Sequence, residues 1–210
     1  MQSESTPPNE FATLPNWWHP RHIPTPPPGY AELVETLRNL LDTFAAAVPD
    51  EDDVAEVTKL LRQATDVLTP MMRDEWSRIS GFARDLPGRG SALLPVVRDQ
   101  RRDGDVLRGK VRFGRFHLGG NGAAHGGTIS LVFDDFMGLF ANVDDRRVSR
   151  TAYLHVNYRN VTPVERDLDI EARFVREEGR KRWLTGVIRD GETVCADAEG
   201  LWVELKPGQP

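Results

Sequence analysis

Apolar residues recur at two different spacings along the chain, helical in the first part and strand-like in the second. Between residues 31 and 48 they fall on one helical face, and Pro49 ends the predicted helix. A second helical face runs from Val54 to Leu68, behind a run of acidic residues that suits a helix N-terminus. Stripes of this size are typical of a core or an interface. We therefore expect both helices to pack on the rest of the protein, on a partner, or as a lid over the mouth of a pocket.

The second part of the chain predicts strands. Residues 92–99 predict a first strand. In the next segment Leu107, Val111 and Phe113 alternate with basic residues, which predicts a half-buried second strand with these three side chains facing inward.

One long apolar segment separates these strands from the remainder of the chain. Residues 128–141 have helical length and are apolar nearly all round, as expected of a helix buried on most sides. Four more strand-like segments lie between residues 151 and 205, and we expect them to form a meander. The predicted fold class is α+β, with an antiparallel sheet wrapped around one long buried helix.

Three regions follow from these patterns. Residues 1–28 are rich in proline and predict an extended arm, in which Trp17 and Trp18 anchor the arm to the body or contact a partner. Residues 29–85 form a helical extension, and residues 86–210 form the domain that contains the sheet and the buried helix.

Composition and charge exclude several classes of protein. The chain has 210 residues, a net charge of −5 and no basic block, so we expect no nucleic-acid partner. A single cysteine, Cys195, excludes an internal disulfide and a cysteine-rich zinc site. No apolar run approaches the roughly 18 residues of a membrane span. The N-terminal residues lack the pattern of a signal peptide, and we expect a cytoplasmic protein.

The chemistry is concentrated in residues 117–142. A loop with five glycines in eleven residues, HLGGNGAAHGG, leads directly into the apolar helix. The first N–H groups of a helix have no internal partner and carry the positive end of the dipole, so they can polarise a carbonyl. Asp134 and Asp135 lie on this helix, where a buried carboxylate is either functional or hydrogen-bonded by a neighbour. Periodicity does not choose between them, although the space beside Gly138 slightly favours Asp134.

Other chemistries lack their motifs. Gly120, Gly122 and Gly126 resemble a dinucleotide loop, but four consecutive strands after a single helix contradict a Rossmann fold. The chain has no G-x-S-x-G nucleophile motif, no H-E-x-x-H motif and no His/Asp cluster with ligand spacing. We therefore expect no metal and no cofactor.

One combination of motifs resembles a known family. His125-Gly126-Gly127 is followed by Asp134, nine residues after the histidine, and then by the segment 151–158 that continues to Thr162-Pro163. This resembles the HGG-type hotdog-fold thioesterases of the PaaI-like group, over roughly residues 91–206. The resemblance implies a hotdog fold for residues 86–210, with the helical extension outside it.

The resemblance also implies a homodimer or a dimer of dimers, with active sites at the subunit interface. Asp134 would act as a general base, or less commonly as a nucleophile, and the Gly126 N–H would polarise the thioester carbonyl. His125 would shape the loop, and Thr151 would help to place the water. Asp134 and Thr151 would come from one subunit, and His125 and Gly126 from the other.

The implied substrate is an acyl-CoA thioester. Arg159, Arg180, Lys181 and Arg182 are candidates for contacts with the CoA phosphates. Related members carry an asparagine where this chain has Gly119, and Asn121 is a candidate substitute. Gly127 and Gly138 complete the predicted substrate-binding set.

Two functions remain open after this reasoning. The first is hydrolysis of acyl-CoA to the free acid and CoA, without metal or cofactor. The alternative is a non-catalytic hotdog module that binds acyl thioesters or acts as an interaction scaffold, because one fold supports unrelated functions. A hotdog hydratase would show a different Asp-to-His pattern at the start of the helix, which the sequence lacks.

Overall fold

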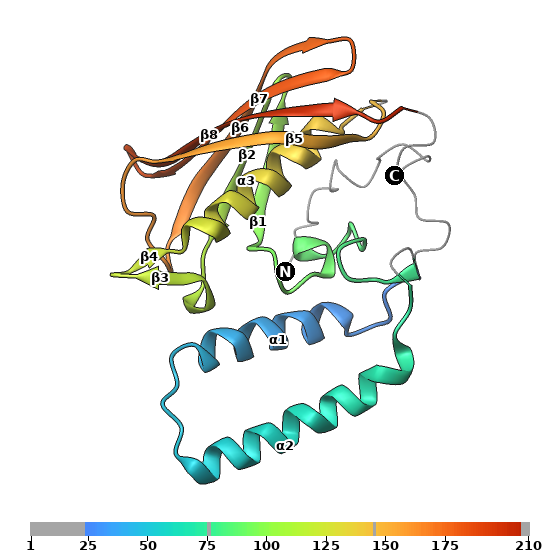
Figure 1. Ribbon diagram of the computed structural model, residues 1–210, viewed down its shortest axis with the longest axis vertical. Helices are drawn as coiled ribbons and strands as arrows, with labels where there is room; N and C mark the ends of the chain where they lie inside the picture. The colour runs from blue at the N-terminus through green and yellow to red at the C-terminus, as the bar shows by residue number, and fades with distance from the viewer. Residues whose placement is uncertain (1–23, 75–76, 145, 207–210) are drawn as a thin grey trace, which may run out of the picture.

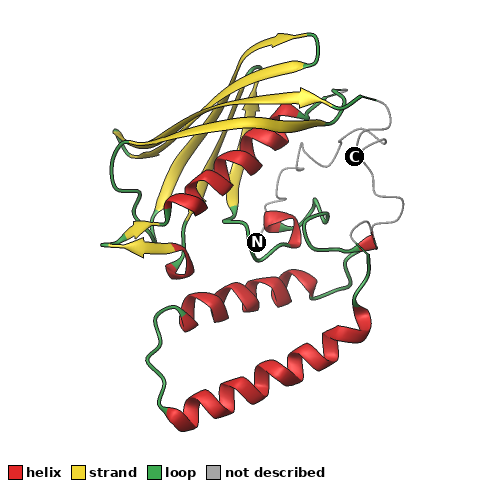
Figure 2. Cartoon of the chain, viewed as in Figure 1, coloured by secondary structure: helices red, strands yellow, loops and turns green. Residues whose placement is uncertain are grey.

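The main body of the protein is a six-stranded antiparallel sheet curved around one long helix, with two further helices outside it (Figures 1 and 2). The computed structural model describes residues 24–74, 77–144 and 146–206. The helices are α1 (Tyr30–Phe44), α2 (Glu51–Leu68) and α3 (Gly126–Ala141), with short 3-10 segments η3 (Thr69–Met71), η5 (Pro87–Gly90) and η6 (Arg115–His117). The predicted sheet wrapped around one helix is confirmed.

The sheet has the strand order β1-β2-β6-β7-β8-β5, with every neighbouring pair antiparallel. Its strands are β1 (Val97–Asp103), β2 (Val106–Arg112), β5 (Ser149–Tyr158), β6 (Asp167–Glu178), β7 (Lys181–Asp190) and β8 (Thr193–Glu204). A separate small hairpin, β3 (Leu118–Gly120) and β4 (Ala123–Ala124), stands before α3.

Helix α3 lies against the concave face of the sheet and supplies the centre of the core (Figure 1). Phe133, Phe136, Met137 and Phe140 are almost completely buried. Each such side chain contributes roughly 1.5–3 kcal/mol relative to its exposed state, which explains why a helix apolar nearly all round needs the sheet around it. The half-exposed side of α3 carries both aspartates.

The predicted meander of four strands is wrong for the first of the four. Strands β6, β7 and β8 do form a meander, but β5 pairs with β8 at the edge of the sheet and not with β6. The connection of residues 159–166 contains Pro163 and is too long for a tight hairpin, so it lets the chain cross to the other side of the meander. Strand alternation predicts strands but not their partners.

The predicted second strand turns the expected side chains toward the core. Leu107, Val111 and Phe113 are fully buried, as the alternation predicts. The first strand begins later than predicted, at Val97 and not near residue 92, because the chain around Pro95 forms bends and turns before it joins the sheet.

The helical extension is attached to the body through α1. Helix α1 contacts η5 and η6 and buries Val34, whereas no described residue of α2 is buried. Figure 1 shows α2 on the far side of α1 from the sheet. Within the described part of the chain, the apolar stripe of α2 thus has no cover, although the sequence predicts that it packs. The Trp17–Trp18 arm lies outside the described residues, and none of the described helices is long and apolar enough to cross a membrane.

Candidate active site

The glycine loop is fixed to the start of α3 by His125. This residue is the N-cap of α3, and its Nδ1 accepts a hydrogen bond from the Gly127 N–H at 3.0 Å. Its carbonyl accepts from the N–H groups of Thr128 and Ile129, and its own N–H donates to the carbonyl of His117 at 2.7 Å. Because Nδ1 is an acceptor, the neutral imidazole carries its proton on Nε2. A Cβ on residue 127 would lie 3.2 Å from Nδ1 of His125, so glycine lets the ring approach the N–H that it accepts from.

Gly126 presents a backbone donor. Its N–H is the first of α3 and has no hydrogen-bond partner among the described residues, as expected at a helix N-terminus. Its carbonyl accepts from the Tyr158 hydroxyl at 3.0 Å, and that hydroxyl also lies 3.0 Å from the hydroxyl of Ser130. A Cβ on residue 126 would come within 3.1 Å of the Tyr158 ring, so a larger residue does not fit without a shift.

Tyr158 and Ser130 are neighbours of the site to which sequence reasoning gave no role. Tyr158 closes the strand motif that carries the family resemblance, so its place in that pattern was a usable signal. Ser130 is one of the few polar residues on α3, and its spacing of four from Gly126 places it on the same face.

The departure at Gly119 has a steric cause. A Cβ on residue 119 would lie 2.8 Å from the Cα of His125, so an asparagine does not fit there. Asn121 and Gly122 are the two turn residues of the β3–β4 hairpin, with φ of 52° and 74°. Two positive φ angles favour the Asn-Gly pair in such a turn. Asn121 is exposed at this turn, and the turn alone explains its identity.

Asp134 is joined to the edge strand. The Thr151 hydroxyl on β5 donates to Oδ1 of Asp134 at 2.7 Å. No other described residue gives this carboxylate a hydrogen bond or an ion pair, and it is only partly buried. Oδ2 is therefore available to a water or a substrate.

Asp135 has a different environment. Arg89 donates to it through both terminal nitrogens, at 3.0 and 2.5 Å, in a bidentate ion pair. About three quarters of each side chain is shielded from solvent. The structure thus gives the two adjacent acids different partners: a guanidinium for Asp135 and a single hydroxyl for Asp134.

Gly126 and Asp134 of one chain do not share a site. Both lie on α3, eight residues apart, which corresponds to roughly 12 Å along the helix axis at 1.5 Å per residue. In a working site the base contacts a water, the water contacts the carbonyl carbon, and the carbonyl oxygen contacts the donor N–H. The distance from base to donor in such a chain of contacts is shorter than this separation along the helix. A site that uses both groups needs them from two chains.

The candidate basic residues for CoA phosphates are mostly engaged elsewhere. Arg159 forms an ion pair with Asp197 at 2.5 Å, and this hydrogen bond holds the pKa of the Asp197 carboxyl below its usual value. Arg180 donates to the backbone carbonyl of Glu204. The ammonium of Lys181 lies 6.0 Å from the centre of the Trp183 ring.

The choice of Arg182 as a phosphate contact is wrong. Its side chain is about 2% exposed, so it does not reach a ligand at the surface. It donates to the backbone carbonyls of Ala141, the last residue of α3, and Arg147. It lies beside the turn between β6 and β7, where basic residues are usually exposed, but its side chain points into the protein and donates to the last carbonyl of α3.

Gly138 has a packing explanation. A Cβ there would lie 3.3 Å from Nε1 of Trp202, so the missing side chain allows the indole to approach α3. The carbonyl of Gly138 accepts from the Asn142 side chain.

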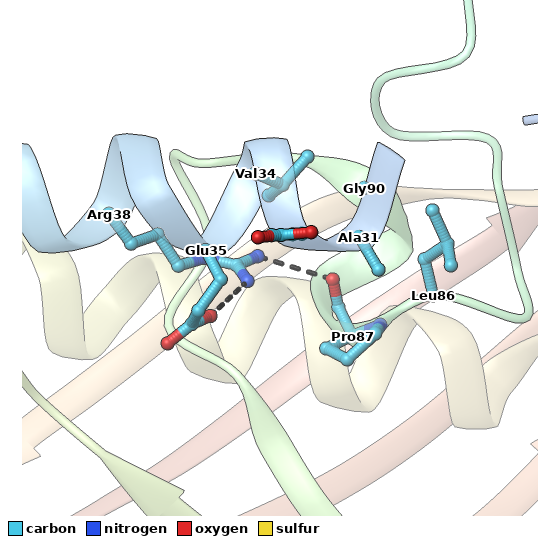
Figure 3. Close-up of a pocket in the computed structure, with 8 residues that line it drawn as sticks. Ala31, Val34, Glu35, Arg38, Leu86, Pro87 and Gly90 are labelled. Carbon is cyan, nitrogen blue, oxygen red and sulfur yellow. Dashed lines mark hydrogen bonds and ion pairs between the residues drawn. The ribbon is translucent and has the colours of Figure 1, made fainter. Parts of the chain in front are cut away.

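A hollow in the described structure lies away from these residues (Figure 3). It has a volume of about 310 Å³ between α1 and η5, and Val34, Glu35, Arg38 and Pro87 are among its lining residues. Arg38 spans it, donating to Glu35 and to the carbonyl of Pro87. None of the predicted site residues lines this hollow. Within the described residues, no group of three or more His, Cys, Asp or Glu side chains is placed to hold a metal ion.

Comparisons with known proteins agree with the fold. The sequence matches no protein-family model and no curated protein. A thioesterase superfamily protein of known crystal structure has a TM-score of 0.71 and 24% identity, covering 87% of this chain and 100% of that one. A Streptococcus mutans protein bound to acetyl CoA (TM-score 0.46, 19% identity) matches over 50% of this chain and 86% of its own. A Shewanella loihica thioesterase superfamily protein (0.44, 20%) matches over 51% and 90%.

The first of these matches extends beyond the sheet and α3. The body of residues 97–206 is little more than half of the chain, so a match over 87% also reaches the N-terminal helices. Together with the antiparallel sheet around α3, this similarity shows that the chain has the hotdog fold, the fold of that thioesterase superfamily protein.

Proposed function

We propose that the protein hydrolyses acyl-CoA thioesters to a free acid and CoA. The observation that carries this proposal is the contrast between the two adjacent acids. Asp135 is neutralised by Arg89, whereas Asp134 keeps an oxygen free beside a single Thr151 hydroxyl. A partly buried carboxylate with one fixed hydrogen bond and an open oxygen suits a general base.

The reaction needs few groups because a thioester carbonyl is already reactive. Asp134 takes a proton from a bound water as the water oxygen forms a bond to the carbonyl carbon. The carbonyl oxygen becomes an oxyanion and accepts from the Gly126 N–H, whose position at the start of α3 places the helix dipole behind it. The C–S bond then breaks, and the proton held by Asp134 passes to the departing CoA sulfur.

The two halves of this site come from two subunits in our proposal. Strand β5 pairs with β8 along one edge, and no described strand pairs with its other edge. Within one chain Thr151, near the start of β5, contacts Asp134, and Tyr158, at its end, contacts Gly126. Antiparallel pairing of β5 with the same strand of a second copy places the start of one strand beside the end of the other. That pairing brings Asp134 toward the partner's Gly126.

The dimer also solves a structural problem. An unpaired ten-residue edge strand exposes a row of backbone donors and acceptors that tends to pair with another chain. Strand β5 contains no proline and no run of charged residues, which are common ways to protect an edge strand. We infer a homodimer through β5, with two equivalent composite sites.

The experiment is a hydrolysis screen over a panel of acyl-CoA thioesters, in which the release of free CoA thiol is measured. Turnover that Asp134→Asn abolishes supports the proposal. Tight binding of acyl-CoA without turnover by the unaltered protein would overturn it and favour a binding module. Sedimentation of the same sample tests the dimer, and an active strict monomer contradicts the composite site.

A further inference from the structure

Helix α1 of the extension and the η5 segment that follows the extension each contact the site region. We propose that α1 and η5 together brace the active site, acting through two positioning residues, Asp42 and Arg89. The proposal rests on the proposed function, because the parts that the brace holds are the carboxylate of Asp134 and the loop that carries the Gly126 N–H.

Arg89 is itself held firmly before it reaches α3. Its backbone carbonyl accepts from the Gly81 N–H at 2.9 Å, and its Nε donates back to the Gly81 carbonyl at 3.0 Å. Arg89 has a left-handed φ of 53°, a conformation that non-glycine residues keep only when their surroundings hold it. This reciprocal pair fixes the guanidinium before it forms its bidentate contact with Asp135.

The Arg89 contact acts on Asp134 in two ways. It fixes α3 one residue from the proposed base, and so limits rotation of that part of the helix. It also neutralises the charge of Asp135, which would otherwise stand unpaired and partly buried one residue from Asp134.

Asp42 holds the other end of the site. It lies near the end of α1, and its Oδ1 accepts from the Phe116 N–H in η6 at 2.8 Å. The carboxylate packs so closely on Gly114 that residue 114 has no room for a Cβ. The next residue in η6, His117, accepts through its carbonyl from the His125 N–H at 2.7 Å. Asp42 therefore supports the loop that ends in His125 and Gly126.

Both contacts bear on the same geometry. In a composite site the base comes from one α3 and the donor N–H from the start of the other, so a small shift of either helix misplaces both groups. Reactions that depend on such alignment lose rate steeply with displacement. Helix α1 and η5 thus contribute to turnover without touching the substrate.

The test uses the full-length chain and separates positioning from general stability. We expect Arg89→Gln to lower kcat about tenfold, with KM changed less than twofold, because substrate contacts remain. Arg89→Lys should recover part of the loss. The double variant Arg89→Gln/Asp135→Asn should recover only the part of the loss that comes from the unpaired charge of Asp135, because α3 still lacks the contact with residue 89. Arg108→Gln, which removes an exposed ion pair with Glu171 on the sheet, is the matched control and should leave kcat unchanged.

The second arm tests Asp42. Asp42→Ala removes the acceptor of the Phe116 N–H and should lower kcat several-fold, whereas Asp53→Ala, which removes a carboxylate that caps α2, should not. An Arg89→Gln variant with unchanged kcat, or a loss that Asp135→Asn relieves completely, overturns the proposal for Arg89. An Asp42→Ala variant that behaves like Asp53→Ala overturns it for Asp42.

A readout without substrate keeps the two proposals distinguishable. Amide hydrogen exchange should rise around residues 131–137 in Arg89→Gln and around residues 114–127 in Asp42→Ala, and not in the controls. If the unaltered protein hydrolyses no thioester, the proposed function fails whatever the exchange result. If exchange in these segments is unchanged, the brace fails even when the protein is active.

Discussion

Thr151 on β5 donates a 2.7 Å hydrogen bond to Oδ1 of Asp134 on α3. The bond joins the edge strand to the central helix, and no described residue hydrogen-bonds to the second carboxylate oxygen. One fixed oxygen and one open oxygen give the carboxylate an orientation without filling its capacity to accept a proton. The pair links the proposed subunit boundary to the proposed base, because β5 is an edge strand of the sheet.

Replacing the proposed base should abolish most turnover. We expect Asp134→Asn to lower kcat by roughly 10²-fold or more, as for the loss of a positioned general base, with little change in the thermal midpoint. Asparagine keeps the hydrogen bond from Thr151, so the fold should be retained. Asp135→Asn should lower kcat much less. Thiol-release kinetics measures kcat of both variants, and circular dichroism measures their thermal midpoints. A larger loss of kcat in Asp135→Asn than in Asp134→Asn would assign the base to Asp135.

Two inactive variants should restore each other in a mixed dimer. Gly126→Pro removes the proposed donor N–H, and proline is tolerated at the first position of a helix. His125 has φ −61° and ψ 133°, a conformation that suits the residue before a proline. Mixing this chain with an Asp134→Asn chain should regain activity through one intact composite site per mixed dimer.

The control for this mixing experiment is each variant alone, refolded in the same way. Because Gly126 packs on Tyr158, the proline variant must first be shown to fold and dimerise. Two well-folded variants that give no activity when mixed would place base and donor in the same chain.

Burial of His117 should make stability fall on acidification. Burial lowers the pKa of His117 below its ordinary value of 6.5, with the nearby Asp42 opposing this effect. The unfolded chain then binds a proton more readily than the folded one. The stability from neutral His117 is complete above pH 6.5 and is lost as pH falls below it, with a slope of less than about 1.4 kcal/mol per pH unit.

His117→Asn is the matched variant for this pH dependence. Asparagine can keep the acceptor for the Gly114 N–H that Nδ1 provides, but it does not titrate. Urea unfolding between pH 7.5 and 5.5 should show a shallower decline in the variant. Equal slopes in both proteins would mean that His117 protonates equally in the folded and unfolded states.

The sequence predicted the parts of this molecule that depend on local pattern. Helix α3 is the long buried helix, and the alternation of Leu107, Val111 and Phe113 matches their complete burial. Strand partners were not predictable, because alternation carries no information on which strand lies beside β5. The direction of Arg182 was missed for a related reason: a basic residue near a turn is usually exposed, and only tertiary contacts with the end of α3 make an inward orientation favourable.

The distinction between the two acids also needed the structure. Asp134 and Asp135 are equivalent by periodicity, and the residue that separates them, Arg89, lies 46 positions away in a segment without a regular pattern. Sequence spacing does not reveal such a contact. The apolar stripe of α2 shows the opposite limit. Its pattern is clear in the sequence, but the pattern does not indicate which surface packs against it.

The buried Arg182 should be a major source of stability for the end of α3. It donates to the carbonyls of Ala141 and Arg147 at 2.9 and 2.8 Å, and to Glu177 at 3.0 Å. Burial would raise the pKa of Glu177, but hydrogen bonds, chiefly from Arg182, outweigh it and hold that pKa below its ordinary value. Arg182→Met keeps much of the volume but leaves these acceptors without their donor. We expect it to lower the free energy of unfolding by about 2–4 kcal/mol.

A surface arginine supplies the comparison for that measurement. Arg173→Met removes an ion pair to Glu171 whose arginine is more than half exposed, and should change stability by no more than about 0.5 kcal/mol. Urea unfolding at one fixed protein concentration compares the two, since dissociation of a dimer would otherwise enter the result. The interior contacts of Arg182 account for the difference because its partners at the end of α3 have no water to replace the lost donor. Equal, small effects of the two substitutions would mean that water reaches those carbonyls and that α3 does not depend on Arg182.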